Sequence, residues 1–191
     1  IGGGWGPTLE PEWFLEFCDY VCFGEGEQPM AEICRRLRHG TPLDDVPNLI
    51  YSRAGRPVHN PVVSPLDVER DSLPFPDFDP EHKYLIENDR LQKGGFYNQK
   101  IYNCLAGRGC PLNCSYCMSS KYRDIYRSHG HRVRKHRLRS VDSVIEELAI
   151  QKKRGAIFVR FIDEVFPFSR QWLDRFLEKY PDSIGLPFFA Y

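Results

Sequence analysis

The chain has 191 residues, enough for one ordinary domain or for parts of two. Lysine and arginine together number 26, as do aspartate and glutamate, so the zero formal charge gives no reason to expect binding to nucleic acid or to an anionic membrane. Hydrophobic residues make up 41% of the chain, which is enough for a packed core, and no apolar run is long enough to span a membrane. The sequence does not open on a secretory signal, which predicts a cytoplasmic protein.

Both ends of the sequence have features that are typical of a segment taken from a longer protein. The chain begins at Ile1 rather than at a methionine, and residues 185–191 have the pattern of a strand that nothing follows. We therefore expect a segment of a longer protein.

The first forty residues have the pattern of a strand, a turn and a helix. Residues 20–23 form a short apolar run, and the glycine-containing residues 24–27 follow it. The next residues place four apolar side chains on one face of a helix before Gly40, namely Met30, Ile33, Cys34 and Leu37, and Cys34 is predicted to be buried in the core. This order favours a parallel sheet, and we interpret residues 1–40 as the end of an α/β domain.

Residues 41–99 are predicted to form a connector. Residues 48–52 and 58–63 flank a turn at Arg53-Ala-Gly-Arg56, which predicts a small hairpin. Further on, Leu73-Pro-Phe-Pro-Asp-Phe-Asp-Pro80 contains three prolines and is predicted to be extended. This proline-rich stretch indicates a domain boundary, or else only a long surface loop.

Strands and helices alternate again from residue 100. Residues 101–105 are a strand candidate, and a loop with several cysteines follows. Ser140 is a suitable N-cap for a helix that ends near Gly155. The buried stripe of this helix is predicted to consist of Val141, Val144, Ile145, Leu148 and Ala149.

A second strand–helix pair and a third strand complete the chain. Residues 157–162 are apolar except for Arg160, as expected for a strand covered on both faces. Ser169 is predicted to cap a helix that Pro181 ends, and residues 186–191 form the next strand candidate. The inward side chains of this helix are predicted to be Trp172, Leu173, Phe176, Leu177 and Tyr180.

Three of the seven cysteines lie within Cys110-Pro-Leu-Asn-Cys114-Ser-Tyr-Cys117. This short spacing allows one loop to direct three thiolates at a single small object, and thiolates select zinc, copper or iron–sulfur clusters. A structural zinc site has four protein ligands, and no second cysteine or histidine pair follows at the usual spacing. Three cysteines leave one iron of a 4Fe-4S cluster open to a cofactor or substrate, unless Cys104 is a fourth ligand. Burial as small hydrophobic side chains is the remaining alternative.

The stretch Gly107-Arg-Gly-Cys110-Pro-Leu-Asn-Cys114-Ser-Tyr-Cys117 resembles the signature of radical S-adenosylmethionine (SAM) enzymes, C-x3-C-x-aromatic-C after the first strand of a barrel. Three upstream stretches are similar to ones that occur in the same order in the cobalamin-binding subgroup. These stretches are Gly3-Gly4-Trp-Gly-Pro-Thr8, Gly24-Glu-Gly-Glu27 and Leu73-Pro-Phe-Pro-Asp77.

The resemblance implies an α/β fold made of the tail of a Rossmann-like cobalamin-binding domain and the first half of a partial (β/α)6 radical SAM barrel. Residues 1–40 would be the C-terminal part of the cobalamin-binding domain. Residues 41–99 would be a connector with the hairpin and the proline-rich linker, and residues 100–191 would be the N-terminal half of the barrel. Only three of the family's six strands are predicted here.

The resemblance also implies a reaction. Cys110, Cys114 and Cys117 would ligate a 4Fe-4S cluster whose fourth iron is bound by SAM. One electron from the cluster would cleave SAM to methionine and a 5′-deoxyadenosyl radical. The implied reaction is methyl transfer to an unactivated carbon of a small-molecule substrate, or a radical cyclisation. The electron would come from a donor protein such as flavodoxin or ferredoxin.

Further residues receive roles from the same resemblance. Tyr116 would line the adenine side of SAM through its backbone. Asp163 or Glu164 would accept a hydrogen bond from the SAM ammonium group, since barrel enzymes have their sites at the C-terminal ends of strands; the alternative is a solvated turn. Gly3 and Gly4 would approach the nucleotide tail of cobalamin. The cobalt-binding motif of the subgroup, Asp-x-His-x-x-Gly, is absent from this sequence, so we expect cobalamin to be bound by the full-length parent protein rather than by this segment alone.

Two alternatives to this interpretation stay open. The first is a non-catalytic iron–sulfur electron carrier that uses Cys104 as its fourth ligand. The second is an RNA-modifying radical SAM relative, because residues 127–139 contain six lysines and arginines and three histidines. A run of charges is more often a solvated loop, and the zero net charge of the chain favours that explanation.

Overall fold

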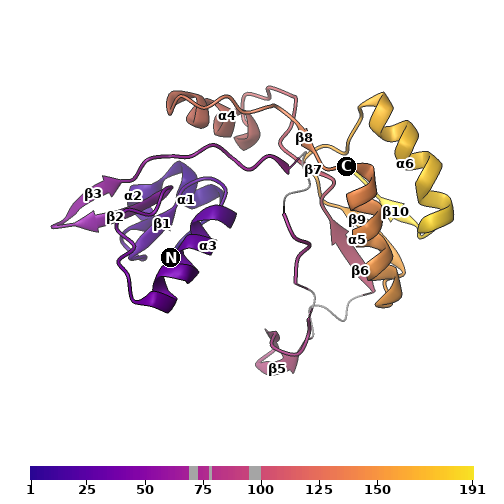
Figure 1. The fold of residues 1–191 in the computed structure, drawn as a ribbon, viewed down its shortest axis with the longest axis horizontal. Coiled ribbons are helices and arrows are strands. Elements are labelled where there is room, and N and C mark those ends of the chain that lie inside the picture. The colour runs from indigo at the N-terminus through magenta and orange to yellow at the C-terminus, as the bar shows by residue number, and fades with distance from the viewer. Residues whose placement is uncertain (69–72, 78, 95–99) are drawn as a thin grey trace. The chain divides into compact units, whose positions relative to one another are not determined.

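The computed structural model describes residues 1–68, 73–77, 79–94 and 100–191 (Figure 1). The remaining connector positions, including Phe78 of the proline-rich stretch, lie outside the described residues. The chain divides into two compact units. The first unit is Ile1–Leu66 with Leu112–Arg134, and the second unit is Asp67–Pro111 with Lys135–Tyr191. This division does not coincide with the three expected ranges, whose assignments stay predictions.

The first unit is built around a three-stranded sheet with the order β1-β2-β3. Its elements in chain order are α1 (Trp5–Leu9), α2 (Pro11–Phe14), β1 (Tyr20–Cys22), α3 (Glu27–His39), β2 (Leu49–Arg53), β3 (Arg56–His59) and α4 (Met118–Ser128). The predicted hairpin is confirmed as β2 and β3, with positive φ at both Ala54 and Gly55. β1 pairs antiparallel with β2, and its parallel pairing is limited to a bridge between Gly2 and Val21. The parallel sheet that the sequence favours for this segment is therefore reduced to this one bridge, and the strand pairs of the unit are antiparallel.

Helix α3 ends as predicted but exposes most of its apolar stripe. Gly40 follows it in a left-handed conformation. Ile33 is buried, packed among residues such as Val46 and Leu49, whereas Met30, Cys34 and Leu37 are exposed. The prediction of a buried Cys34 is wrong because only one edge of the stripe meets the rest of the unit.

The second unit contains a parallel sheet whose strand order follows the chain. Its elements are β4 (Tyr84–Glu87), β5 (Arg90–Lys93), β6 (Ile101–Cys104), β7 (Gly107–Arg108), β8 (Arg137–Leu138), α5 (Val141–Lys153), β9 (Phe158–Phe161), α6 (Arg170–Ser183) and β10 (Phe188–Phe189). β6 pairs parallel with β9, and β9 pairs parallel with β10. The predicted alternation of strand and helix is confirmed. Parallel strands that are neighbours both in the chain and in the sheet have the connectivity of a singly wound α/β sheet.

Two antiparallel pairs complete the second unit. β4 and β5 form a hairpin that the sequence reading missed, with a turn at Asn88 and Asp89, both of which have positive φ. β7 pairs with β8 across the segment that leads to the cysteine loop. These short pairs lie outside the parallel sheet of β6, β9 and β10.

The core of the second unit lies between the sheet and its two helices. Fully buried side chains from α5, β9 and α6 meet there, including Leu148, Phe161 and Phe176. The prediction that residues 157–162 are covered on both faces is wrong, because Ile157 is 55% exposed and Ile162 is 44% exposed. The helices cover one face of the sheet, so burial along β9 alternates.

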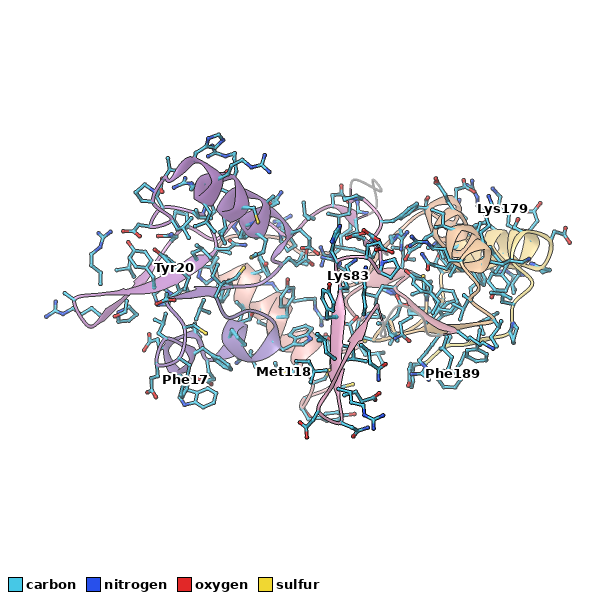
Figure 2. The ribbon with its side chains drawn as sticks, turned by 90° about the horizontal axis from the view of Figure 1, so that it is seen from below. Phe17, Tyr20, Lys83, Met118, Lys179 and Phe189 are labelled. Carbon is cyan, nitrogen blue, oxygen red and sulfur yellow. The ribbon has the colours of Figure 1, made fainter. Side chains whose placement is uncertain are left out.

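Helix α6 differs from its prediction at two positions. It continues through Pro181 to Ser183, and Leu177 is exposed rather than inward. Figure 2 labels Lys179 on this helix and Phe189 in β10, the strand that follows it. None of the helices in the described ranges is both long and apolar enough to cross a membrane.

Candidate functional site

The cysteine loop connects the two compact units. Cys110 is buried at the end of a segment of the second unit, while Cys114 and Cys117 are half-buried in the first unit. All three thiols are free of disulfides. Within the described ranges, no three His, Cys, Asp or Glu side chains are grouped as a metal site. Ligation of a cluster by these cysteines therefore stays a prediction.

The second half of the loop is a tight turn against the start of α4, near Met118 in Figure 2. The Cys117 N–H donates a hydrogen bond to the Cys114 carbonyl at 3.1 Å. The Ser120 hydroxyl lies 3.1 Å from the Cys114 carbonyl oxygen and 2.7 Å from that of Cys117. The first turn of α4 thus fixes the backbone between these two cysteines.

Arg123 holds the preceding part of the same loop. Its side chain is buried, and its Nη2 donates to the Leu112 carbonyl at 3.2 Å and to the side-chain oxygen of Asn113. Its Nη1 donates to the Ser119 carbonyl at 3.3 Å. The sequence reading missed both Ser120 and Arg123. Their three-residue spacing directly after the motif places them on one face of α4 and is the signal that indicates such a role.

Asp163 and Glu164 follow β9 and bind the backbone that leads to Cys110. The buried carboxylate of Asp163 accepts hydrogen bonds from the Ala106 N–H at 3.1 Å and from the Gly107 N–H at 2.7 Å. Glu164 is exposed and accepts from the Gly109 N–H at 3.2 Å. Both carboxylates therefore shape the approach to the cysteine loop. Their contact with a SAM ammonium group stays a prediction.

Burial gives Asp163 an unusual pKa. Desolvation raises its pKa to about 6, although the N–H groups of Ala106 and Gly107 act in the opposite direction. The folded state therefore binds this proton more tightly than the unfolded chain, in which an aspartate titrates near 4. A carboxylate with a raised folded-state pKa makes the protein less stable as the pH rises through that window.

We expect the free energy of unfolding to fall between pH 4 and pH 6 by up to about 3 kcal/mol through Asp163 alone. Asp163→Asn removes this contribution, so the difference in stability between wild type and variant changes across the window and is constant above it. Urea denaturation at a series of pH values measures the difference. Asp142→Asn is the control, because the pKa of Asp142 is lowered by Lys179 and Arg175. A wild-type-minus-variant difference that does not change from pH 4 to pH 6 would contradict the assignment.

Two glycines before Cys110 allow the backbones on the two sides of the β7–β8 pair to approach each other closely. A Cβ on Gly107 would lie 2.8 Å from the Arg137 carbonyl oxygen. Gly109 has a φ of +85°, and a Cβ there would lie 2.6 Å from the Lys135 carbonyl oxygen. The predicted sharp turn at these glycines is confirmed, and close backbone approach is its cause.

The other predicted site residues lie apart from these contacts. Tyr116 is 90% exposed at the tip of the loop. Gly3 follows the Gly2–Val21 bridge, and Gly4 has a φ of +98° at the start of α1. The Gly4 carbonyl accepts the Thr8 hydroxyl at 2.7 Å. The predicted contacts of Tyr116 with SAM and of Gly3 and Gly4 with cobalamin stay predictions.

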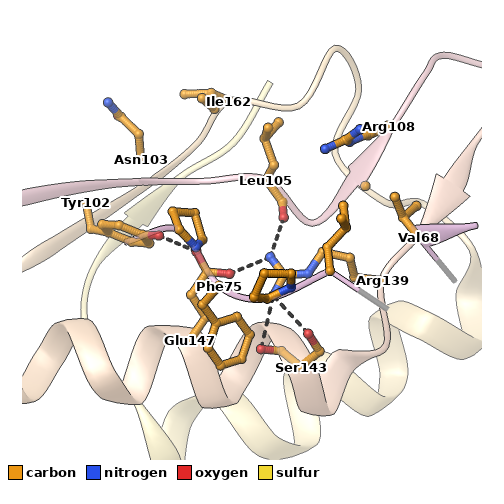
Figure 3. Close-up of a pocket in the computed structure, with 14 residues that line it drawn as sticks. Val68, Phe75, Tyr102, Asn103, Leu105, Arg108, Arg139, Ser143, Glu147 and Ile162 are labelled. Carbon is orange, nitrogen blue, oxygen red and sulfur yellow. Dashed lines mark hydrogen bonds and ion pairs between the residues drawn. The ribbon is translucent and has the colours of Figure 1, made fainter. Parts of the chain in front are cut away.

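A cavity of about 180 Å³ lies beside β6 and the N-terminal half of α5 (Figure 3). The buried carboxylate of Glu147 accepts a hydrogen bond from the Tyr102 hydroxyl and pairs with the Arg139 guanidinium at 2.5 Å. Arg139 also donates to the Leu105 carbonyl at 2.9 Å and lies 5.7 Å from the centre of the Phe75 ring. The proline-rich stretch thus lines this cavity, a role that its composition did not reveal.

The pKa of the Tyr102 hydroxyl, which lines the cavity, is also shifted. Burial, together with the neighbouring carboxylate of Glu147, raises the pKa of the Tyr102 hydroxyl well above its usual range. The Tyr102 hydroxyl therefore remains a neutral hydrogen-bond donor at any physiological pH.

The structure bears on the two alternatives. Cys104 is fully buried in the core of the second unit among residues such as Val144 and Leu148, where burial raises its thiol pKa. These apolar surroundings favour the neutral thiol, as expected for a cysteine that packs in the core. In the basic run, Arg137 is buried in β8 and Arg139 is held by Glu147. The run is therefore not a continuous exposed surface.

The chain is similar to one curated protein in sequence and to parts of solved structures in fold. No known protein-family model matches it. A protein of Pyrococcus horikoshii, named as an uncharacterized methyltransferase, is 32% identical over 175 residues, which cover 90% of this chain and 34% of that protein. Among solved structures, the radical S-adenosylmethionine methyltransferase TsrM of Kitasatospora setae, with cobalamin and a [4Fe-4S] cluster bound, matches all of this chain with a TM-score of 0.66 and 18% identity.

A second solved structure has a similar arrangement. The cobalamin-dependent S-adenosylmethionine radical enzyme OxsB matches 86% of this chain with a TM-score of 0.58 and 23% identity. The chain spans 36% of TsrM and 21% of OxsB, and about a third of the curated relative. The chain therefore has a mixed α/β fold that it shares with part of these two enzymes.

Proposed function

We propose that this chain belongs to a cobalamin-dependent radical SAM methyltransferase, with Cys110, Cys114 and Cys117 as the ligands of a 4Fe-4S cluster. The observation that carries the proposal is the spacing of three cysteines on a loop between the parallel strand β6 and helix α4. The fold likeness to TsrM and OxsB and the name of the curated relative support it.

The donor set fits an iron–sulfur cluster better than other metals. Three thiolates are soft ligands, and three of them leave one corner of a four-iron cluster for an external ligand. When bound, such a cluster supplies the electron for reductive cleavage of SAM. The protein's part is to orient the ligands and to exclude water.

This chain's own residues perform the positioning. Ser120 and Arg123 hold the loop around Cys114 and Cys117 from α4. Asp163 and Glu164 hold the backbone between β6 and Cys110. Both halves of the loop thus have backbone hydrogen-bond partners before any metal binds, which reduces the conformational entropy that ligand binding has to offset.

Further parts of the proposal concern cofactors and partners. Tyr116 and Asp163 or Glu164 are proposed to contact SAM, and Gly3 and Gly4 are proposed to approach cobalamin. A small-molecule substrate accepts the methyl group, and an electron donor such as flavodoxin or ferredoxin reduces the cluster. Radical cyclisation is the alternative outcome of the same chemistry.

Anaerobic reconstitution with iron and sulfide tests the ligand assignment. We expect the wild-type chain to bind about four iron atoms and to turn brown. Cys110→Ser, Cys114→Ser and Cys117→Ser each lower the iron content at least several-fold, because a serine hydroxyl is a much harder ligand than a thiolate. Cys34→Ser is the matched control, since Cys34 is exposed on α3. Equal iron content in all four variants would contradict the proposal.

Cys104→Ala separates this proposal from the electron carrier. We expect unchanged iron content in this variant, because Cys104 packs in the core. Loss of the cluster would instead support a carrier whose four iron corners are all held by the protein.

A further inference from the structure

Within the first unit, the fully buried Tyr126 of helix α4 packs against the Gly24–Glu25 turn. The hydroxyl of Tyr126 accepts hydrogen bonds from the Glu25 N–H at 3.1 Å and from the Tyr122 hydroxyl at 3.3 Å. A Cβ on Gly24 would lie 2.0 Å from the Tyr126 hydroxyl oxygen, and the φ of Gly24 is +75°. Only glycine at position 24 allows Tyr126 to sit where it does.

The turn that receives Tyr126 is itself tied to the loop at Gly3 and Gly4. The Gly24 N–H donates to the Thr8 hydroxyl oxygen at 3.0 Å, and the buried Thr8 hydroxyl donates to the Gly4 carbonyl at 2.7 Å. Each link is a hydrogen bond between groups that are at least partly buried. Such bonds are costly to leave unmade, so the links hold the turn and the glycine loop in a fixed relation.

Other side chains of α4 hold the cysteine loop. Ser120 contacts the carbonyls of Cys114 and Cys117, and Arg123 contacts Leu112. Arg123 lies about one turn and Ser120 about two turns before Tyr126 on the same helix. A rigid helix therefore connects the cysteine loop with the Gly24–Glu25 turn.

We propose that Gly24 and Tyr126 are positioning residues that fix Cys114 and Cys117 relative to the Gly3–Gly4 loop. The inference rests on the proposed function, in which the cysteines hold the cluster that binds SAM and the Gly3–Gly4 loop approaches cobalamin. Methyl transfer between two cofactors requires that they be held at a set distance. The Gly24–Tyr126 contact itself is a property of the chain without any cofactor, and it is tested in that state.

Hydrogen–deuterium exchange of the metal-free chain measures the contact. We expect Gly24→Ala to speed exchange at residues 112–123 about ten-fold or more, because the added Cβ displaces Tyr126 and loosens α4. Gly55→Ala is the matched control, since Gly55 has a φ of +73° and open space around a Cβ. This control variant has the same backbone strain without the clash. We expect it to leave the exchange rates at residues 112–123 unchanged.

A double variant separates positioning from general destabilisation. Phenylalanine at position 126 lacks the hydroxyl that a Cβ at Gly24 would meet first. We expect Tyr126→Phe combined with Gly24→Ala to exchange more slowly at residues 112–123 than the sum of the single effects predicts. Strictly additive effects, or equal exchange in Gly24→Ala and Gly55→Ala, would overturn the proposal.

If Gly24→Ala does not fold, Tyr126→Phe alone tests the proposal, because it removes the hydroxyl that accepts the hydrogen bond from the Glu25 N–H. Faster exchange at residues 112–123, with unchanged exchange in β9 and α6 of the second unit, supports the inference. Unchanged exchange throughout overturns it. Because iron is absent, none of these results depends on whether the cysteines bind a cluster.

Discussion

Replacing Glu147 by alanine is expected to destabilise the second unit by about 3–5 kcal/mol, the usual cost of removing one partner of a buried ion pair. The Glu147 side chain is 3% exposed, and its partner Arg139 is 18% exposed. The alanine variant leaves the Arg139 guanidinium and the Tyr102 hydroxyl without their shared acceptor. Arg139 keeps its bond to the Leu105 carbonyl, which limits the loss.

Helix α5 offers a matched control for this variant. Asp142 lies on the same helix and pairs with Arg175 and Lys179, but about half of each side chain is exposed. Exposed pairs contribute little, so Asp142→Ala is expected to cost less than about 1 kcal/mol. Urea denaturation monitored by tryptophan fluorescence compares the two, because Trp172 lies in the same core. Equal losses in both variants would show that burial does not decide the energetics here.

Replacing Gly109 by alanine is the second large effect, and it acts directly before Cys110. Left-handed backbone costs a residue with a Cβ about 1–3 kcal/mol. The new Cβ would also lie 2.6 Å from the Lys135 carbonyl oxygen, a backbone atom that cannot rotate away. We therefore expect a loss above that range, displacement of the β7–β8 ribbon, and reduced iron uptake in reconstitution.

Gly130→Ala isolates the backbone part of this effect. Gly130 has a φ of +81°, and a Cβ there meets nothing within 4 Å. The control is expected to lose only the 1–3 kcal/mol of conformational strain and to keep its iron content. If Gly109→Ala matches Gly130→Ala in both stability and iron content, the close approach of Gly109 to Lys135 does not matter for the loop.

The sequence predicted the strand–helix alternation of the second unit well, because local signals are strong there. The side chain of Ser140 caps α5 by accepting the Ser143 N–H at 3.0 Å. Val144 and Leu148 are buried on the predicted stripe. Capping residues and apolar periodicity act over a few neighbouring residues, so they can be read without tertiary information.

The sequence-based predictions of burial and of helix ends were wrong where contacts with a neighbouring element determine them. Periodicity showed an apolar edge on α3 but not that Cys34 and Leu37 would stay uncovered. Pro181 was expected to end α6, yet the helix continues for two residues beyond it. A proline in the last turn removes a single helical hydrogen bond, which the end of a helix tolerates better than its middle.

The candidate site was found by spacing, but the residues that support it were not. The motif alone identifies Cys110, Cys114 and Cys117. The partners of Asp163 lie 56 and 57 positions away in sequence, and Tyr126 meets Glu25 across 101 positions. Contacts over such separations depend on the fold, so no local pattern of residues predicts them.

Electron paramagnetic resonance of the reduced, reconstituted protein tests the central claim most directly. If three cysteines hold the cluster and one iron is open, adding SAM changes the spectrum, whereas adding adenosine, which lacks the amino and carboxylate groups, does not. A spectrum that SAM leaves unchanged in protein with full iron content would contradict the account, because every corner of the cluster would then have a protein ligand.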